Sequence, residues 1–352
     1  MAPFIPHSRP CVGEAESRAT ARVIAGRHLA QGPRVRAFEE EMGCFAGLLP
    51  GVAVSSGTAA LHLSLLALDI GPGDQVLLPS YVCTAPLLAV RYTGATPVLV
   101  DADPETGNMD LDDLRKKRAG KCKAIIAVHL FGLPLDMEKV CDLGVPVVED
   151  CAQALGAFIG ERPAGTFGRL SVCSFYATKL MTTGEGGMVL SSDSALLERI
   201  RDLRDYDKRR DFKLRFNYKT TDLAAAMGRC QLHRLPSFLE DRRQLADRYK
   251  RNLDGLPCAP PPKSLCRVHY RYVVSIDSSV EQTVEALGEH GIEAASPVHR
   301  PLHRFLNLEG FPGAEACARK HLSLPLYPDL SFQEVDRVCE ALKNILLGER
   351  SS

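Results

Sequence analysis

Short apolar segments alternate with helix-like segments between residues 51 and 190. The apolar runs are continuous rather than alternating, which is typical of strands buried on both faces of a parallel sheet. These runs predict strands at 52–56, 75–79, 96–100, 124–128 and 146–150. Helical patterns lie between them at 58–68, 85–92 and 136–141. The pattern therefore predicts an α/β fold, with helices on both faces of a mostly parallel sheet.

The pattern changes after residue 221. A long helix-prone stretch, 222–253, is interrupted only by Pro236. After it, a turn, a strand and two helices are predicted, at 256–262, 268–276, 280–290 and 332–347. We therefore expect two parts: a large domain over residues 1–235, which includes an N-terminal arm, and a small C-terminal α+β domain over residues 236–352.

The composition excludes several kinds of protein. Length alone, 352 residues, is enough for about two domains. The 43 Lys and Arg residues are balanced by 43 Asp and Glu residues, which argues against nucleic acid or an anionic membrane as the partner. The apolar runs are shorter than the ~20 residues of a membrane span, and residues 1–13 contain no apolar core of a signal peptide. We expect a cytoplasmic protein.

The cysteines support the same compartment. Twelve are present, scattered and without any C-x-x-C pair, so they are expected to be reduced thiols that act as small hydrophobic residues. Cys266 and His269 have a spacing typical of metal ligands, but no second pair completes a zinc site. No metal is expected.

A candidate anion site lies between the first strand and its helix. Ser56, Gly57 and Thr58 place a glycine and hydroxyl groups at a helix N-terminus, where free N–H groups and the helix dipole favour an anion such as phosphate. The alternative is an ordinary helix cap by Ser or Thr. The segment matches neither the G-x-G-x-x-G nor the Walker pattern, so dinucleotide and P-loop nucleotide sites are disfavoured.

Asp150 and Lys179 are the strongest candidates for chemistry. Asp150 closes a buried strand, where a carboxylate needs a cation or donors to offset lost hydration. Lys179 lies between an apolar run and a glycine-rich turn, and a desolvated lysine there can form a Schiff base. Their alternatives are a capping aspartate and a solvated surface lysine. An anion site, a carboxylate and a lysine in this order suit pyridoxal 5'-phosphate, PLP.

The chain resembles the DegT/StrS-like sugar aminotransferases, a family of fold-type-I PLP enzymes, and the resemblance extends nearly end to end. It rests on the order and spacing of many short stretches together. These are 31–33, 38–39, 56–61, 94–98, 148–154, 174–175, 179, 184–188, 217–218, 221–222 and 322–328.

The resemblance implies roles for individual residues. Lys179 would form the Schiff base with the cofactor and then move a proton between cofactor and substrate. Asp150 would keep the pyridine nitrogen protonated, and Gln153 would contact the ring or its phenolic oxygen. Ser174 would hold the phosphate together with the anion site, and Asn217 would reach the phosphate in the neighbouring subunit, with Lys219 as the alternative. A homodimer with shared active sites is therefore expected.

Some positions depart from the family pattern. Cys83 stands where relatives often stack an aromatic ring on the cofactor, with Tyr81 two residues earlier. The family's Pro-Leu-His motif is present only as 301–303, without the usual downstream residues. The charged segment 201–215 is either a solvated face or a contact for a substrate diphosphate. The candidate substrate-binding residues are Tyr176, Glu185, His303 and Arg215.

The resemblance implies amino transfer to a keto group of a nucleotide-linked sugar, in polysaccharide or natural-product sugar biosynthesis, with glutamate as the expected amino donor. Dehydration of such a sugar is an alternative, but in that branch a histidine replaces the lysine, and Lys179 is present. Amination of a carbocycle is a second alternative. A non-catalytic regulator is a third, although neither a helix-turn-helix nor a basic domain is visible.

Overall fold

The computed structural model describes residues 3–118, 122–262, 264 and 266–348. Its main feature is a seven-stranded sheet with the order β1-β9-β8-β5-β4-β2-β3. The strands are β1 (Val52–Val54), β2 (Gln75–Pro79), β3 (Thr96–Val100), β4 (Cys122–Val128), β5 (Val147–Asp150), β8 (Leu170–Ser174) and β9 (Gly187–Leu190). Neighbouring strands from β3 to β8 are parallel, and only β9 runs against its neighbours. The predicted α/β fold with a mostly parallel sheet is confirmed.

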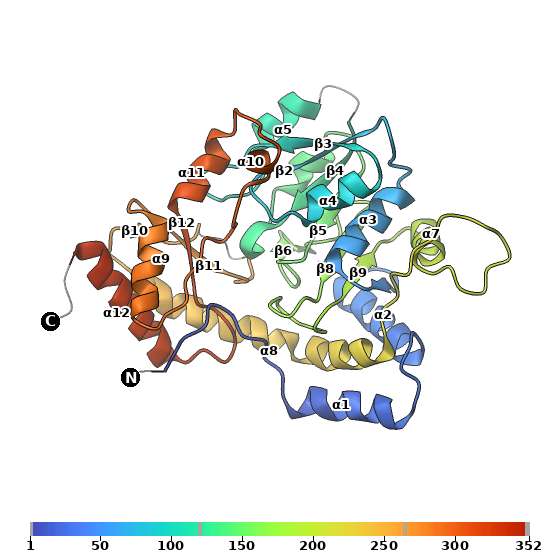
Figure 1. The fold of residues 1–352 in the computed structure, drawn as a ribbon, viewed down its shortest axis with the longest axis horizontal. Helices are drawn as coiled ribbons and strands as arrows, with labels where there is room; N and C mark the ends of the chain where they lie inside the picture. The colour runs from blue at the N-terminus through green and yellow to red at the C-terminus, as the bar shows by residue number, and fades with distance from the viewer. Residues whose placement is uncertain (1–2, 119–121, 263, 265, 349–352) are drawn as a thin grey trace.

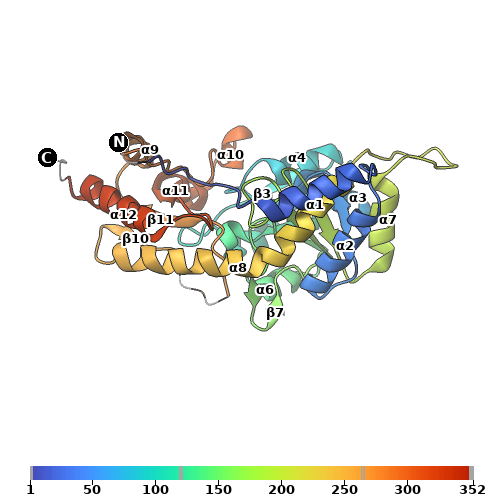
Figure 2. The same ribbon diagram turned by 90° about the horizontal axis from the view of Figure 1, so that it is seen from below.

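Helices cover both faces of this sheet (Figures 1 and 2). On one face, α3 (Gly57–Ala67), α4 (Ala85–Tyr92) and α7 (Ser194–Arg204) pack on alternate strand residues such as Ile126. On the other face, α5 (Leu111–Arg118) and α6 (Met137–Cys141) pack on the intervening residues, such as Ile125. Burial on both faces explains why these strands are apolar throughout.

A third group of helices packs beside α5 and α6, against the β8–β9 end of the sheet. It consists of α2 (Pro33–Ala46) and the first half of α8 (Asp222–Asn252), with α1 (Glu14–Ala25) packed on α8. Thr221 caps α8 by accepting a hydrogen bond from the Ala224 N–H at 3.1 Å. The helix continues through Pro236, so the expected division after residue 235 falls within one continuous helix. The division into two domains stays a prediction.

The C-terminal part is built around an antiparallel three-stranded sheet, β10 (Cys258–Ala259), β11 (Tyr272–Ile276) and β12 (His321–Leu324). Its core is closed by α9 (Val280–Glu289), α12 (Phe332–Leu347) and the second half of α8. The N-terminal arm returns to this part, where Ile5 forms a parallel bridge with Ile292. The smaller elements are η1 (Leu130–Gly132), β6 (Phe158–Ile159), β7 (Arg162–Pro163), α10 (Leu302–Phe305) and α11 (Pro312–Lys320).

Most predicted elements are confirmed within a few residues, but others were not predicted, including α1, α2, α5, α7, α11, β8, β9 and β12. The predicted strand at 268–276 is shorter than expected and starts at Tyr272. All twelve cysteines are free thiols. Across the described part of the chain, we find no helix whose length and hydropathy would let it span a membrane.

Candidate active site

The candidate residues meet at the carboxyl ends of neighbouring parallel strands, the edge where α/β sheets bind ligands. Asp150 is the last residue of β5 and pairs in register with Val172 of β8. Ser174 ends β8, and the turn that follows carries Lys179, whose N–H donates to the Tyr176 carbonyl at 2.9 Å. The sheet thus brings together Asp150, Ser174 and Lys179, which are distant in sequence.

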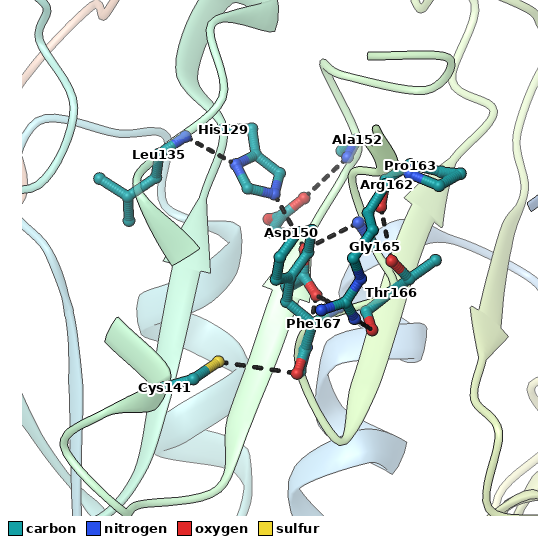
Figure 3. A network of polar contacts seen from close by, with 12 residues as sticks. His129, Leu135, Cys141, Asp150, Ala152, Arg162, Pro163, Gly165, Thr166 and Phe167 are labelled. Atoms are coloured by element: carbon teal, nitrogen blue, oxygen red, sulfur yellow. Dashed lines mark hydrogen bonds and ion pairs between the residues drawn. The ribbon is translucent and has the colours of Figure 1, made fainter. Parts of the chain in front are cut away.

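Asp150 has one oxygen engaged and one available. Its carboxylate is only 6% exposed, and Oδ1 accepts a hydrogen bond from the Ala152 N–H at 2.9 Å (Figure 3). No described residue donates a hydrogen bond to the second oxygen. Burial raises the pKa of Asp150, while the Ala152 N–H and the charge of Lys179 act in the opposite direction. A buried carboxylate in this state is stabilised by a cationic ligand.

Glu149, the preceding residue, belongs to a structural network instead. Its carboxylate accepts hydrogen bonds from the N–H groups of Gly165, Phe167 and Gly168, in the loop seen in Figure 3. His129 Nδ1 accepts from the Leu135 N–H at 3.0 Å, so Nε2 carries the proton and donates to Glu149 at 3.2 Å. These hydrogen bonds outweigh burial and lower the pKa of Glu149.

The same network includes the side chain of Cys151, close enough to His129 and Glu149 for the three to share a metal ion. Both Glu149 oxygens, however, already accept protein N–H groups, and His129 uses both ring nitrogens. The arrangement is therefore accounted for by the protein's own hydrogen bonds.

The candidate anion site lies at the N-terminus of α3. Ser56 is the helix cap and accepts a hydrogen bond from the Ala59 N–H at 3.1 Å, so the capping alternative describes its side chain correctly. Gly57 lies against Ser174, and a Cβ at residue 57 would stand 2.9 Å from the Ser174 Cβ. The next N–H groups, those of Gly57 and Thr58, precede the first intrahelical hydrogen bonds. They leave a small cradle beside Ser174 that suits a phosphate.

Gln153 is oriented by an unusual turn. Its Oε1 accepts a hydrogen bond from the Phe131 N–H at 2.8 Å, which leaves the amide NH₂ as a donor for a ligand. Phe131 itself has a left-handed backbone, with φ of 55°. At Gly132, a Cβ would come within 2.0 Å of the Val268 carbonyl oxygen, so glycine is required there.

The two candidates for ring stacking lie in different environments. Tyr81 is fully buried, and its ring packs edge-on against Phe131 and His321. Cys83 is exposed and lies within the field of both Asp150 and Lys179. Loss of hydration at the sulfur raises the pKa of the Cys83 thiol despite the opposing charge of Lys179, so the thiol is uncharged at neutral pH. Of the two, Cys83 is the side chain that can reach a ligand between Asp150 and Lys179.

Tyr270 is a site residue that the sequence analysis missed. Its buried ring lies beneath the Lys179 ammonium, with 5.0 Å between Nζ and the ring centre. Burial would raise the pKa of Tyr270, but Lys179, Arg271, a hydrogen bond with Thr178 and the charge of Arg242 lower it to about 8. The residue was assigned to a strand by its apolar neighbours, and no local signal connects it with Lys179.

The four candidate substrate residues have different surroundings. Tyr176 and Glu185 are exposed beside the Lys179 turn. His303 is buried, with its ring nitrogens 2.7 Å from Ser80 Oγ and 2.8 Å from Glu315 Oε1, and it connects α10 to the end of β2 and to α11. Arg215 pairs with two aspartates, Asp202 at 3.0 Å and Asp211 at 2.9 Å. Of the four, Tyr176 and Glu185 are thus exposed, whereas His303 and Arg215 are held by other side chains of the protein.

Asn217 and Lys219 lie on the segment that returns from α7 toward the anion site. The Ser55 N–H donates to the carbonyl of Tyr218, between them, at 2.8 Å. Asn217 is exposed, whereas the Lys219 ammonium pairs with Asp205 and Asp207. Asn217 is thus the freer of the two side chains.

The fold and these residues define a class: an α/β protein with a carboxylate, a lysine and an anion cradle at one sheet edge. The chain belongs to the DegT/DnrJ/EryC1/StrS aminotransferase family, whose model matches residues 10–343. The family predicted from the sequence is thereby confirmed, and amino transfer as the class of activity agrees with it.

Individual relatives match over nearly their whole length. The chain is 35% identical over 328 residues to "GDP-perosamine synthase" of Escherichia coli O157:H7, covering 89% of this chain and 90% of the relative. It is 34% identical to "dTDP-4-dehydro-2,3,6-trideoxy-D-glucose 4-aminotransferase" of Saccharopolyspora spinosa, covering 94% of each. The solved PLP-form of a putative sugar aminotransferase from Streptococcus pneumoniae superposes with a TM-score of 0.93, at 27% identity, over 99% of this chain and 100% of that one.

Proposed function

We propose that this protein is a PLP-dependent aminotransferase that transfers an amino group from glutamate to a keto group of a nucleotide-linked sugar. The proposal rests mainly on one observation: Lys179 and Asp150, whose carboxylate has one oxygen without a protein donor, lie at the sheet edge that also carries the anion cradle of α3. The names of the two relatives support the class of acceptor, because each name contains a sugar linked to a nucleoside diphosphate.

The donor set fits PLP. The free oxygen of Asp150 suits a protonated ring nitrogen, the NH₂ of Gln153 suits the phenolic oxygen, and Ser174 with the N–H groups of Gly57 and Thr58 suits the phosphate. Cys83 offers a neutral, polarisable surface to the ring. When bound, the cofactor supplies an electron sink that stabilises negative charge at the substrate carbon.

Lys179 is assigned two duties. Its Nζ would hold the cofactor covalently in the resting enzyme, and it would later accept the proton from the substrate carbon and return it at the neighbouring atom. The ring of Tyr270 lies beneath Nζ and limits where the ammonium can move. Asp150 stays ionised in this arrangement because its charge is paired with a cationic ligand.

Three rival functions follow from the same residues. A sugar dehydratase is disfavoured by Lys179, which stands where that branch has a histidine. Amination of a carbocycle would use the same groups and differs only in the acceptor. A non-catalytic regulator is disfavoured because it would have no use for a buried carboxylate with a free oxygen near a lysine.

We also propose a homodimer with shared sites, in which Asn217 reaches the phosphate in the partner subunit. Two observations support it: Asn217 is exposed next to the segment that leads into α3, and the loop between α7 and α8 exposes Phe212 and Leu214. Figure 1 shows this loop extending away from the body of the subunit. Such exposed apolar side chains are typical of a protein interface. The twelve free thiols suit a reducing, cytoplasmic compartment.

The experiment is a two-stage assay of the purified holoenzyme. Glutamate alone should release one 2-oxoglutarate per subunit and bleach the near-visible absorbance. The recovered enzyme should then aminate a nucleotide-linked keto-sugar, which mass spectrometry detects as exchange of the keto oxygen for an amine. Loss of water from the sugar without gain of nitrogen would indicate the dehydratase. Failure of every amino donor to release an oxo acid would refute the proposal.

A further inference from the structure

Arg271, the residue just before β11, is the second cation against the ring that contacts Lys179. Its guanidinium carbon lies 4.9 Å from the centre of the Tyr270 ring, and Lys179 Nζ lies 5.0 Å from the same centre. Arg271 Nη2 also lies 3.5 Å from the Tyr270 hydroxyl. The same aromatic ring therefore contacts both the guanidinium of Arg271 and the ammonium of the candidate-site lysine.

The partners of Arg271 hold it without neutralising it. Nη1 lies 2.9 Å from His7 Nδ1, and because a guanidinium only donates, this ring nitrogen accepts. The other nitrogen, Nε2, can then donate to Ser323 Oγ at 2.9 Å. Burial and the charge of Arg271 lower the pKa of His7 to about 3, so His7 is neutral at physiological pH. The N-terminal arm thus supplies an uncharged acceptor that orients Arg271.

Arg271 differs in this respect from two other half-buried arginines. Arg229 pairs with Glu41 and Arg248 pairs with Asp336, whereas no carboxylate of a described residue lies within 4.0 Å of Arg271. The buried Arg242 and the half-buried Arg267 also lack a carboxylate, but backbone carbonyls accept the hydrogen bonds of both. A half-buried cation that keeps its charge free is compensated most simply by an anionic ligand.

We propose that Arg271 binds a carboxylate of the amino donor. This inference rests on the proposed function, because the donor would react beside Lys179 and carries a carboxylate on the reacting carbon. The planar guanidinium matches a carboxylate with two parallel hydrogen bonds, and its place on the Tyr270 ring keeps it within reach of the same small molecule. The diphosphate of the sugar substrate is the other anion available. Apart from Lys179, Arg271 is the only described cation on the Tyr270 ring. A single guanidinium favours a carboxylate over the larger and more highly charged diphosphate.

Binding of glutarate, a dicarboxylate without the reactive amine, tests the proposal without turnover. Calorimetric titration of the holoenzyme should give saturable binding. Arg271→Gln should weaken it at least about tenfold, the scale of a lost charge-assisted hydrogen bond. Arg271→Lys keeps the charge but loses the fork, and should fall between the two. Arg243→Gln, at an exposed site on α8 where the guanidinium pairs with Glu240 and Asp247, should bind glutarate like the wild type.

Three results would overturn the proposal. They are absence of glutarate binding to the wild type, unchanged binding in Arg271→Gln, and loss of nucleoside diphosphate binding in that variant with glutarate binding preserved. Cofactor content and circular dichroism identify a variant that fails to fold, in which case Arg271→Lys alone decides. The proposed function fails separately, if the wild type releases no 2-oxoglutarate from glutamate.

Discussion

Two consecutive acidic residues show how neighbouring side chains acquire different chemistry. Glu149 and Asp150 lie on one buried strand and point to opposite sides of the sheet. Glu149 accepts hydrogen bonds from three backbone N–H groups and from His129, and these lower its pKa despite burial. Asp150 meets a single N–H, and burial raises its pKa. The first carboxylate is satisfied by the protein, and the second is left for a ligand.

Asp150→Asn should therefore leave the fold intact and slow amino transfer. An amide cannot hold a positive charge on the ring nitrogen, so we expect turnover to fall by about 100-fold or more and the cofactor to be retained less well. Steady-state kinetics and absorbance after dialysis measure the two effects. Turnover close to that of the wild type would mean that another group protonates the ring.

The sequence predicted the residues whose neighbours carry a local signal. Asp150 follows an apolar strand, and Lys179 lies between a strand and a glycine-rich turn. Tyr270 and Arg271 carry no such signal, because their contact with Lys179 exists only after the chain has folded. His303 was selected from a motif, and the structure places both of its ring nitrogens against Ser80 and Glu315.

At the scale of elements, apolar continuity predicted the parallel strands β2, β3, β4 and β5, and most of the less apolar elements were missed. Helix α7 has polar residues at most of its positions, and it packs through only a few, such as Leu197 and Ile200. Strand β9 has four residues and begins within the pair Gly186-Gly187, which indicates a turn. Its antiparallel direction depends on pairing with β1 and β8, which no local pattern specifies.

The loop at 165–168 shows how one strand holds its neighbour. Both carboxylate oxygens of Glu149 in β5 accept N–H groups of the loop, three in all. In Glu149→Gln, an NH₂ group would take the place of one of these oxygens and would face N–H groups that it cannot accept. We expect a loss of about 3 kcal/mol in the free energy of unfolding at pH 7, measured by urea titration. Glu240→Gln on the exposed face of α8 is the matched control and should change stability little.

The difference in the free energy of unfolding between the wild type and Glu149→Gln should also depend on pH. The pKa of Glu149 is lower in the folded chain than its ordinary value of 4.5. Its contribution to stability is therefore complete above pH 4.5 and is lost as the pH falls toward the folded-state pKa. The difference in stability between wild type and Glu149→Gln should shrink on going from pH 7 to pH 4. A difference that grows on acidification would contradict the assigned network.

At the scale of the whole molecule, α8 and the N-terminal arm connect the two halves of the subunit. Helix α8 packs on α1 and α2 at one end and on α12 at the other. The arm carries His7 to Arg271, close to the Lys179 ring contact. Figures 1 and 2 show the α7–α8 loop extending from the opposite end, where a second subunit would be met.

Shared active sites predict complementation between two inactive variants. Lys179→Ala and Asn217→Ala chains, co-expressed, should form mixed dimers in which one of the two sites carries both wild-type residues. Random pairing would restore about a quarter of the wild-type activity. Each variant expressed alone, at the same protein concentration, is the control.

Two outcomes would contradict this assembly. A monomer by light scattering that still turns over would refute shared sites. A dimer in which Asn217→Ala keeps full activity and loses only about 1 kcal/mol of stability would assign Asn217 to the turn before α8, and Lys219 would be tested next.

The central claim is that Lys179 holds the cofactor, and one measurement tests it directly. The holoenzyme is reduced with borohydride, digested, and mapped by mass spectrometry. We predict a single modified peptide, with the pyridoxyl group on Lys179, and no modified peptide from Lys179→Ala treated in the same way. A pyridoxyl group on any other lysine, or an unmodified Lys179 in a protein that retains its cofactor, would contradict the account.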